Sequence, residues 1–154
     1  MSVTLAIETP LQDDIRDLVQ RLNAYLNPLS PPEFQFQMTV EQMADSATTL
    51  FVARNEAGAA VGMGALKQQD AAMGEVKRMF TVPEMRGKRI GSALLEAIEQ
   101  LARENGLKVL MLETGSEAIM PEAHRLYQRG GFSPRGPFLD YPESPWSAFY
   151  EKQL

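Results

Sequence analysis

A basic turn that carries two glycines is the segment of this sequence with the clearest chemistry. The turn reads Arg86-Gly87-Lys88-Arg89-Ile90-Gly91-Ser92, and it directly precedes a long amphipathic stretch. The first N–H groups of a helix lack partners and lie at the positive end of the helix dipole, so they attract anions. Glycine in such a turn lets a phosphate come close to the backbone. Positive side chains are unfavourable there unless an anion faces them. The turn therefore predicts a phosphate-binding site.

The inventory of reactive side chains excludes several kinds of site. The chain has no cysteine and a single histidine, His124. This excludes disulfides, thiolate metal sites, a cysteine nucleophile and paired-histidine metal sites, so we expect no metal. A net charge of −5 argues against a nucleic-acid-binding surface, because phosphate contacts need clustered lysine and arginine. We expect His124 to be an exposed helix residue rather than a catalyst.

The length and the apolar content suit a single folded domain over residues 1–154. Hydrophobic residues make up 44% of the chain, and chains of this size rarely divide into several cores. No run approaches the roughly 20 apolar residues that cross a bilayer, and the N-terminus lacks a basic flank followed by an apolar segment. We therefore expect a cytosolic protein with neither a membrane nor a nucleic-acid partner.

Apolar spacing predicts the elements that precede the basic turn. A helix from Ile15 to Leu26 ends before Pro28, and Thr39 begins a short helix that runs to Asp45. The proline-rich segment 28–32 is too apolar for a plain linker, which predicts a loop packed over another part of the protein. The expected strands are Val3 to Glu8, Leu50 to Ala53, Ala60 to Leu66 and Glu75 to Val82, with a hairpin turn at Asn55 to Gly58.

After the basic turn, one apolar stripe predicts a long helix from Ile90 to Ala102, and Asn105-Gly106 ends this helix. Val109 to Leu112 is a continuous apolar run, typical of a strand that is buried on both faces. Strand, helix and strand in this order predict that the strands at 75–82 and 109–113 run parallel, with a right-handed crossover. A helix near 121–129 and a last strand near 148–152 follow.

Three ordered motifs resemble those of one family. The turn from Arg86 to Gly91 resembles motif A of the GNAT acyltransferases, Arg/Gln-x-x-Gly-x-Gly/Ala, which begins the helix that carries the CoA pyrophosphate. The preceding strand over 75–83 fits the family, and residues 123–132 resemble its A-x-x-L-Y-x-x-x-G-F motif. The resemblance implies an α/β fold with a mixed, mostly antiparallel central sheet of six or seven strands, splayed at the parallel pair and flanked by about four helices.

The resemblance also implies acetyl-CoA as co-substrate, and it assigns the residues that bind it. Backbone N–H groups near Phe80 to Val82 would orient the pantetheine and polarise the thioester carbonyl, as in an oxyanion hole. The first glycine of the family motif is replaced by Arg89, which costs on the order of 1 kcal/mol if its φ is positive, and a guanidinium on the pyrophosphate would offset that cost. The implied cofactor-binding residues are Phe80, Thr81, Val82, Arg86, Gly87, Lys88, Arg89, Ile90, Gly91 and Ser92.

Acetyl transfer to an amine needs a neutral amine and a proton for the leaving thiolate. An α-amino group titrates near about 8 and a lysine-like amine near about 10.4, so a base assists. By the resemblance, Glu75 lies where many GNAT enzymes hold a water-relaying glutamate, and Glu113 ends the neighbouring parallel strand. The base is one of these two, bulk water or another group. Tyr127 is the expected proton donor to the thiolate. The plainer alternatives are two solvated strand-end carboxylates and a half-buried packing tyrosine.

The acceptor end of the site departs from the family pattern. The family often has asparagine just after the strand that follows the motif A helix, whereas this chain has Glu113-Thr114-Gly115. Lys77 and Arg78 are expected on opposite faces of their strand, so that only one faces a substrate. A substrate carboxylate bound there would suit an amino acid or a similar small acid.

The resemblance predicts an N-acetyltransferase that acts on a small-molecule amine and that forms a homodimer. Two alternatives stay open. A protein or peptide N-acetyltransferase would share the fold, although the acidic chain has no evident peptide-binding tract. A non-catalytic acyl-CoA-binding or sensing module would keep residues 86–92 but would need neither Tyr127 nor the two glutamates.

Overall fold

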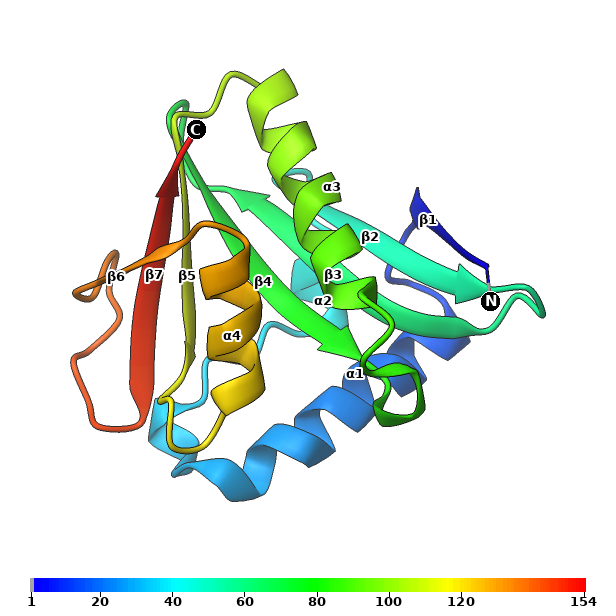
Figure 1. The fold of residues 1–154 in the computed structure, drawn as a ribbon, viewed down its shortest axis with the longest axis horizontal. Coiled ribbons are helices and arrows are strands. Elements are labelled where there is room, and N and C mark those ends of the chain that lie inside the picture. The colour runs from blue at the N-terminus through cyan, green and yellow to red at the C-terminus, as the bar shows by residue number, and fades with distance from the viewer. Residues whose placement is uncertain (1) are drawn as a thin grey trace.

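The computed structural model describes residues 2–154, and a seven-stranded sheet forms its centre (Figure 1). The order across the sheet is β1-β2-β3-β4-β5-β7-β6. Neighbouring strands run antiparallel except β4 and β5, which run parallel, so the mixed and mostly antiparallel sheet is confirmed. The strands are β1 (Val3–Ile7), β2 (Thr48–Asn55), β3 (Ala60–Gln68), β4 (Met73–Thr81), β5 (Val109–Gly115), β6 (Ser133–Arg135) and β7 (Ser147–Gln153).

Helices cover both faces of the sheet. In Figure 1, α3 and α4 lie on one face, and α1 lies on the other. The long helices turn apolar stripes to the sheet, and Ile15 and Leu22 of α1 and Leu94 and Ile98 of α3 are buried. The α-helices are α1 (Asp13–Leu26), α2 (Val40–Met43), α3 (Ile90–Glu104) and α4 (Pro121–Arg129), and the 3₁₀ turns are η1 (Asn27–Leu29), η2 (Pro32–Phe34) and η3 (Pro83–Met85).

The sheet opens between its two parallel strands. Pairing of β4 with β5 stops at Glu75 and Met111, after which the two strands diverge (Figure 1). β5 instead stays paired with β7 along its whole length, from Val109 to Gly115. The strands β5, β7 and β6 therefore separate from the other four, and a wedge opens beside the second half of β4.

A β-bulge in β4 lies beside this wedge. Met63 of β3 pairs with Phe80, and Ala65 pairs with Lys77, so Arg78 and Met79 together oppose Gly64. Arg78 has a left-handed backbone, with φ of 55°. The extra residue interrupts the alternation of side chains along the strand, and this changes which side chains share a face.

Local sequence signals explain most of the elements. Thr39 and Gln42 form a reciprocal capping box at the start of α2, as the expected short helix requires. The Asn55 side chain accepts backbone N–H groups within the hairpin turn. The proline-rich segment forms η1 and η2 and lines the cleft through Leu29 and Phe34. Several boundaries differ from expectation: α1 begins at Asp13, β2 spans Thr48–Asn55, β4 spans Met73–Thr81, and β5 runs on to Gly115. The short strand β6 was not foreseen.

None of the helices within residues 2–154 combines the length and the apolar character needed to span a membrane.

Candidate active site

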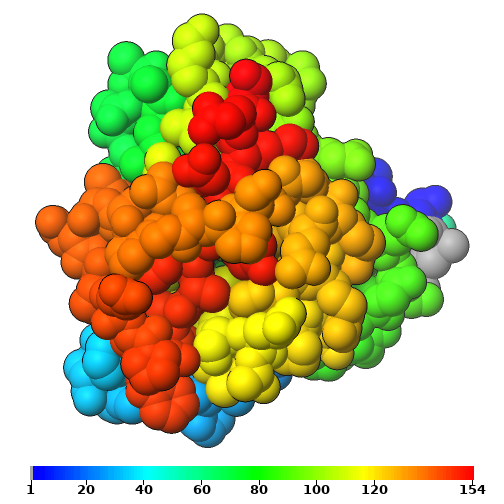
Figure 2. All heavy atoms as spheres, turned by 60° about the vertical axis from the view of Figure 1, so that its left-hand side comes forward, coloured from blue at the N-terminus to red at the C-terminus, as the bar shows by residue number. Residues whose placement is uncertain are grey.

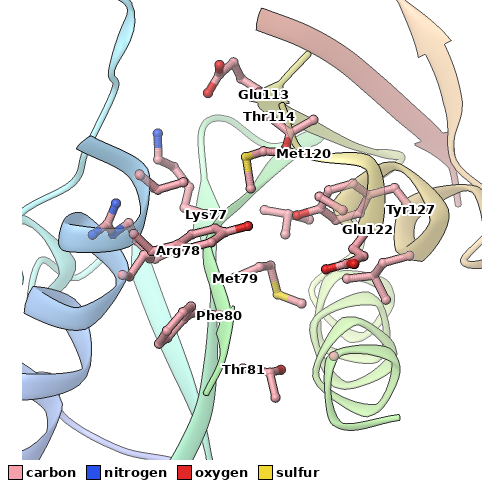
Figure 3. Close-up of a pocket in the computed structure, with 18 of the residues that line it drawn as sticks. Lys77, Arg78, Met79, Phe80, Thr81, Glu113, Thr114, Met120, Glu122 and Tyr127 are labelled. Carbon is pink, nitrogen blue, oxygen red and sulfur yellow. The ribbon is translucent and has the colours of Figure 1, made fainter. Parts of the chain in front are cut away.

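A cleft of about 830 Å³ fills the wedge between β4 and β5 (Figure 3). One end is walled by the C-terminal part of α1 and the segment 29–37. The other end is walled by the start of α3 and by α4. The cleft thus passes through the sheet between β4 and β5, so elements on both faces of the sheet line it.

The start of α3 is open to an anion. Arg89 is the N-cap in the left-handed conformation, with φ of 61° and ψ of 23°, and no side chain among residues 2–154 caps this end. Its first turn holds no acidic residue, and Arg86, Lys88 and Arg89 are exposed around it. Unpaired N–H groups, the helix dipole and three cations therefore coincide, which favours binding of a phosphate group. Because the φ of Arg89 is positive, its backbone is strained by on the order of 1 kcal/mol, as expected for a residue with a Cβ in this conformation.

The middle of the cleft has free backbone. Beyond Glu75, β4 has no strand partner on the side of β5 within the described chain, so the backbone groups of residues 76–81 on that side are available to a ligand. Met79 and Thr81 point toward α3 and α4 in Figure 3, whereas Phe80 points to the other side.

Glu75 is buried and already saturated with donors. Glu75 is 2% exposed, so the plainer alternative of a solvated strand-end carboxylate does not hold for it. The Gln69 amide donates to Oε1 at 2.8 Å, Lys77 Nζ donates to Oε2 at 3.3 Å, and the Tyr141 hydroxyl donates to the same Oε2. Three donors therefore already occupy this carboxylate, which leaves it little room to accept a hydrogen bond from an acceptor amine.

Glu113 has the opposite environment. It is half-buried at the end of β5 and lines the cleft. Burial raises the pKa of its carboxyl to about 7, and the charge of Glu75 also raises it, while the Ser147 hydroxyl and the charge of Lys77 act against this. A carboxyl with this pKa exchanges protons near neutral pH, as a general base must.

Tyr127 reaches the cleft from α4, opposite β4 (Figure 3). Burial, and then the charge of Glu113, raise the pKa of its hydroxyl above the ordinary tyrosine value. The hydroxyl is therefore protonated at neutral pH and is able to donate.

His124, one turn before Tyr127 on α4, is 5% exposed, so the expectation that it is an exposed residue is wrong. Its Nδ1 lies 2.7 Å from the Tyr150 hydroxyl, and its Nε2 lies 2.8 Å from the Gly115 carbonyl oxygen. The carbonyl must accept from Nε2–H, so Nδ1 is the acceptor for Tyr150. His124 joins α4 to β5 and β7, and it sets the position of Tyr127.

Lys77 and Arg78 share a face, contrary to the expectation that they lie on opposite faces. Both side chains lie on the same side of β4 in Figure 3, and both line the cleft. The bulge at Arg78 supplies the extra residue that cancels the usual alternation. Lys77 Nζ donates to the Tyr141 hydroxyl at 2.8 Å as well as to Glu75, whereas Arg78 donates to the Asn23 side chain of α1.

The model of the acetyltransferase (GNAT) family matches residues 14–132. The chain belongs to the GNAT acetyltransferase family.

Related proteins and structures agree with this membership. An IAA acetyltransferase of Azospirillum brasilense is 43% identical over 154 residues, 99% of each chain. The N-acetyltransferase YsnE of Bacillus subtilis (strain 168) is 35% identical over 147 residues, which are 92% of this chain and 97% of YsnE. A crystal structure from Klebsiella pneumoniae, described as an acyl-CoA N-acyltransferase, matches with a TM-score of 0.82 and 31% identity over 99% of this chain and 97% of the other. This GNAT protein is an acetyl-CoA-dependent acyltransferase.

Most of the residues expected to bind CoA in this GNAT acetyltransferase line the cleft. Two do not. Val82 is 2% exposed and packs in the core, and its N–H donates to the Val61 carbonyl at 3.0 Å. Lys88 is exposed beside the turn and outside the cleft wall. The predicted residues that do line it are Phe80, Thr81, Arg86, Gly87, Arg89, Ile90, Gly91 and Ser92, together with Glu75, Glu113 and Tyr127.

Sequence reasoning missed the residues that build the acceptor end of the cleft. Asn23 holds Arg78, and Tyr141 holds Glu75 and Lys77. Tyr25, Phe34 and Trp146 line the cleft. They come from α1 and from segments without regular periodicity, so only their aromatic character stood out in the sequence.

Proposed function

We propose that this protein moves the acetyl group of acetyl-CoA directly to the amine of a small molecule. One observation carries the proposal: a carboxyl with a pKa of about 7, Glu113, and a protonated phenol, Tyr127, line the same cleft. A base and an acid are the two proton-transfer groups that direct transfer needs. A module that only binds or senses acyl-CoA needs neither.

The residues present fit acetyl-CoA, which supplies the acetyl group as an activated thioester. The start of α3 would hold its pyrophosphate, with unpaired N–H groups and with Arg86 and Arg89 nearby. Backbone groups of residues 76–81 in the wedge would hold the pantetheine arm. Because Val82 already gives its N–H to Val61, the donors at the thioester end come from residues before it.

Glu113, rather than Glu75, is our choice for the base. The Glu75 carboxylate is held by three donors, and a proton taken there would have to displace them. Glu113 has a raised pKa and no such ring of donors. In its ionised form it takes a proton from the incoming ammonium group, and Glu75 positions Lys77, whose charge favours that ionised form.

Tyr127 is our choice for the acid. Its hydroxyl keeps its proton because burial raises its pKa. It donates that proton to the CoA sulfur as the thiolate leaves. A positioned general acid lowers the activation barrier of this step. His124 positions the helix that carries it.

A small acceptor is favoured because two segments meet across the acceptor end of the cleft and narrow it. The Phe36 ring packs edge-on against the Tyr141 ring, with centroids 5.0 Å apart, and joins the segment before α2 to the segment before β7. Figure 2 shows these two segments, blue-cyan and orange-red, side by side at the lower edge of the molecule. A peptide would need an open groove there. The relative from Azospirillum brasilense is named for a small acceptor. The cytosolic location, the single domain and the homodimer stay predictions from the sequence.

Release of CoA that depends on an acceptor tests the proposal. Purified protein with acetyl-CoA is assayed against a library of small amines and a library of peptide N-termini, with acetyl-CoA alone as the control. We expect turnover with some small amines and none with peptides. Turnover with peptides only would support the protein N-acetyltransferase, and tight acetyl-CoA binding without any turnover would support the non-catalytic module.

A further inference from the structure

Arg78 is a buried cation without a counter-ion. Its residue is 8% exposed, and none of the ion pairs formed within residues 2–154 includes it. The Asn23 side-chain oxygen accepts from Nη2, and Nε has no partner in the described chain. A guanidinium has five N–H donors, so most of its donors are unused. An unpaired buried charge is costly, which indicates that a ligand completes the site.

The charge of Arg78 persists although it is buried. Burial lowers the pKa of the guanidinium to about 10, and no neighbouring charge contributes to that shift. At neutral pH the group is therefore still a cation. Its position also has a cost of its own, because a residue with a Cβ at a φ of 55° is strained by about 1 kcal/mol. The bulge nevertheless directs this side chain to the α1 side of the cleft.

Lys77 cannot take the same part. Its ammonium group already donates to Glu75 and to the Tyr141 hydroxyl. Lys77 thus has a counter-ion and one N–H donor left, whereas Arg78 has no counter-ion within residues 2–154 and has several donors left for a ligand. A planar guanidinium binds a planar carboxylate through two parallel hydrogen bonds, which a lysine does not do.

The cleft around Arg78 is lined by flat apolar side chains. Phe34, Phe36 and Trp146 belong to the wall of the cleft that Arg78 also lines, and they come from the segment before α2 and the segment before β7. Aromatic walls stack on flat rings and contribute about 0.5–1.5 kcal/mol for each ring pair beyond the area buried. The ligand that completes the site therefore joins an anionic group to a ring.

We infer that Arg78 anchors a carboxylate on the acceptor, and that the acceptor joins an amine, a carboxylate and a flat apolar group, as aromatic α-amino acids do. This inference rests on the proposed acetyl transfer to a small amine. It adds the chemistry that selects the amine, and it assigns to Arg78 a part in binding rather than in proton transfer.

Matched pairs of acceptors test the carboxylate. L-Phenylalanine and 2-phenylethylamine differ only in that group, as do L-tryptophan and tryptamine. For the wild-type protein, kcat/KM should fall about 10- to 100-fold when the carboxylate is removed, the range expected for a hydrogen-bonded ion pair. In Arg78→Gln the two members of a pair should react alike, and Arg78→Lys should recover part of the preference. Arg103→Gln, which changes an exposed arginine on α3 outside the cleft wall, should keep it. An equal rate for both members of each pair in the wild type overturns the inference.

A binding experiment separates this inference from the proposed function. 3-Phenylpropionate has the ring and the carboxylate but no amine, and 3-phenylpropanamide lacks the charge. Calorimetry with CoA present should show binding of the acid to the wild type, at least tenfold weaker binding to Arg78→Gln, and weak binding of the amide to both. This result can hold even if no amine is acetylated, in which case only the proposed function fails. Equal binding of acid and amide to the wild type overturns the inference, and it does so even if Arg78→Gln does not fold.

The two remaining arms decide the kind of anion and the need for the ring. 1-Amino-2-phenylethylphosphonic acid replaces the carboxylate by a phosphonate, and L-alanine removes the ring. We expect L-phenylalanine to exceed both in kcat/KM. A higher value for the phosphonate would overturn the assignment of a carboxylate, and a higher value for L-alanine would overturn the aromatic acceptor.

Discussion

Tyr127 gives the sharpest test of the chemistry at the scale of one residue. Tyr127→Phe keeps the ring that packs against Phe132 and Tyr150 and removes only the hydroxyl. Acetyl-CoA affinity should stay within about twofold, because the helix packing is unchanged, while kcat should fall by the roughly 10²–10⁴-fold typical of a lost general acid. Stopped assays of CoA release, with calorimetry for acetyl-CoA, measure both quantities. Tyr25→Phe, which removes a hydroxyl from another tyrosine of the cleft wall, is the control and should stay active.

Glu113 predicts the pH dependence of the rate. Since burial raises the pKa of this carboxyl to about 7, kcat/KM should rise with pH up to about 7 as the base ionises. Glu113→Gln should lose that limb and should recover activity only as the amine deprotonates unaided at higher pH. Glu75→Gln is the matched variant, and it should keep the limb near pH 7. If Glu75→Gln loses the limb and Glu113→Gln keeps it, the two roles are reversed.

The same carboxyl also predicts a pH dependence of stability. Its pKa rises from 4.5 to about 7 on folding, so the native protein binds the proton more tightly than the unfolded chain does. The contribution of this proton to the free energy of unfolding is complete below pH 4.5 and is lost as the pH rises to 7. Glu113→Gln has no such loss, so it should gain stability relative to wild type across that window. Urea unfolding at pH 4.5, 6 and 8 measures the gain, and an equal difference at all three values contradicts the raised pKa.

Part of the site could be predicted from residues and part could not. The anion site at the turn from Arg86 to Ser92 could be predicted, because a helix start, glycines and cations coincide in one short stretch of sequence. The surroundings of Glu75 and His124 depend on Tyr141 and Tyr150, which lie 66 and 26 residues away in the chain, and on Gln69 and Gly115, which reach them across a turn. No local pattern reports such partners, so the environment that separates the two glutamates became visible only in the fold.

Strain at the start of α3 gives a prediction at the scale of an element. Arg89 has a φ of 61°, whereas Lys88 has no positive φ. Glycine relieves strain only at the first position, while it adds flexibility to the unfolded chain at both. Arg89→Gly should therefore be more stable than Lys88→Gly by about 1 kcal/mol. It should also bind acetyl-CoA more weakly than wild type if the Arg89 guanidinium meets the pyrophosphate. Thermal unfolding and calorimetry of both variants make the comparison, and equal stability would argue against strain at Arg89.

Elements with a strong period were predictable, and irregular ones were not. The stripes of α1 and α3 and the turn at Asn55 follow from local rules, as does the capping box of α2. The bulge at Arg78 has no such signal, because an arginine with a positive φ is disfavoured and only the pairing of β4 with β3 demands it. β6 could not be predicted, because three residues are too few to show an alternating pattern and the proline among them disfavours a strand.

At the scale of the whole molecule, the wedge divides the sheet into two parts that a ligand can join. β4 belongs to one part and β5 to the other, and they share only the pairs from Met73 to Glu75 with Val109 to Met111. α3 links β4 to β5 along the chain, and α4 follows β5, so the walls of the cleft come from both parts. A ligand in the wedge therefore contacts both parts of the sheet, and its binding energy should appear in the stability of the whole protein.

Acetyl-CoA should accordingly raise the melting temperature. At a concentration of 100 times its Kd, linkage adds about 2.7 kcal/mol, which corresponds to an increase of about 5 to 10 °C for a chain of this size. Analogues that lack the pyrophosphate should raise the melting temperature less, because the open start of α3 then has no anion.

Gly91→Asp tests the contact between the pyrophosphate and the start of α3. A Cβ at Gly91 would lie 3.4 Å from Leu126 Cδ2, which α4 tolerates, so the main change is a negative charge at the anion site. This variant should fold, and acetyl-CoA should leave its melting temperature unchanged. Gly91→Ala is the uncharged control and should retain most of the wild-type increase. A normal increase in Gly91→Asp would move the pyrophosphate away from the start of α3, and no increase in the wild type at millimolar acetyl-CoA would remove the basis for the proposed binding mode.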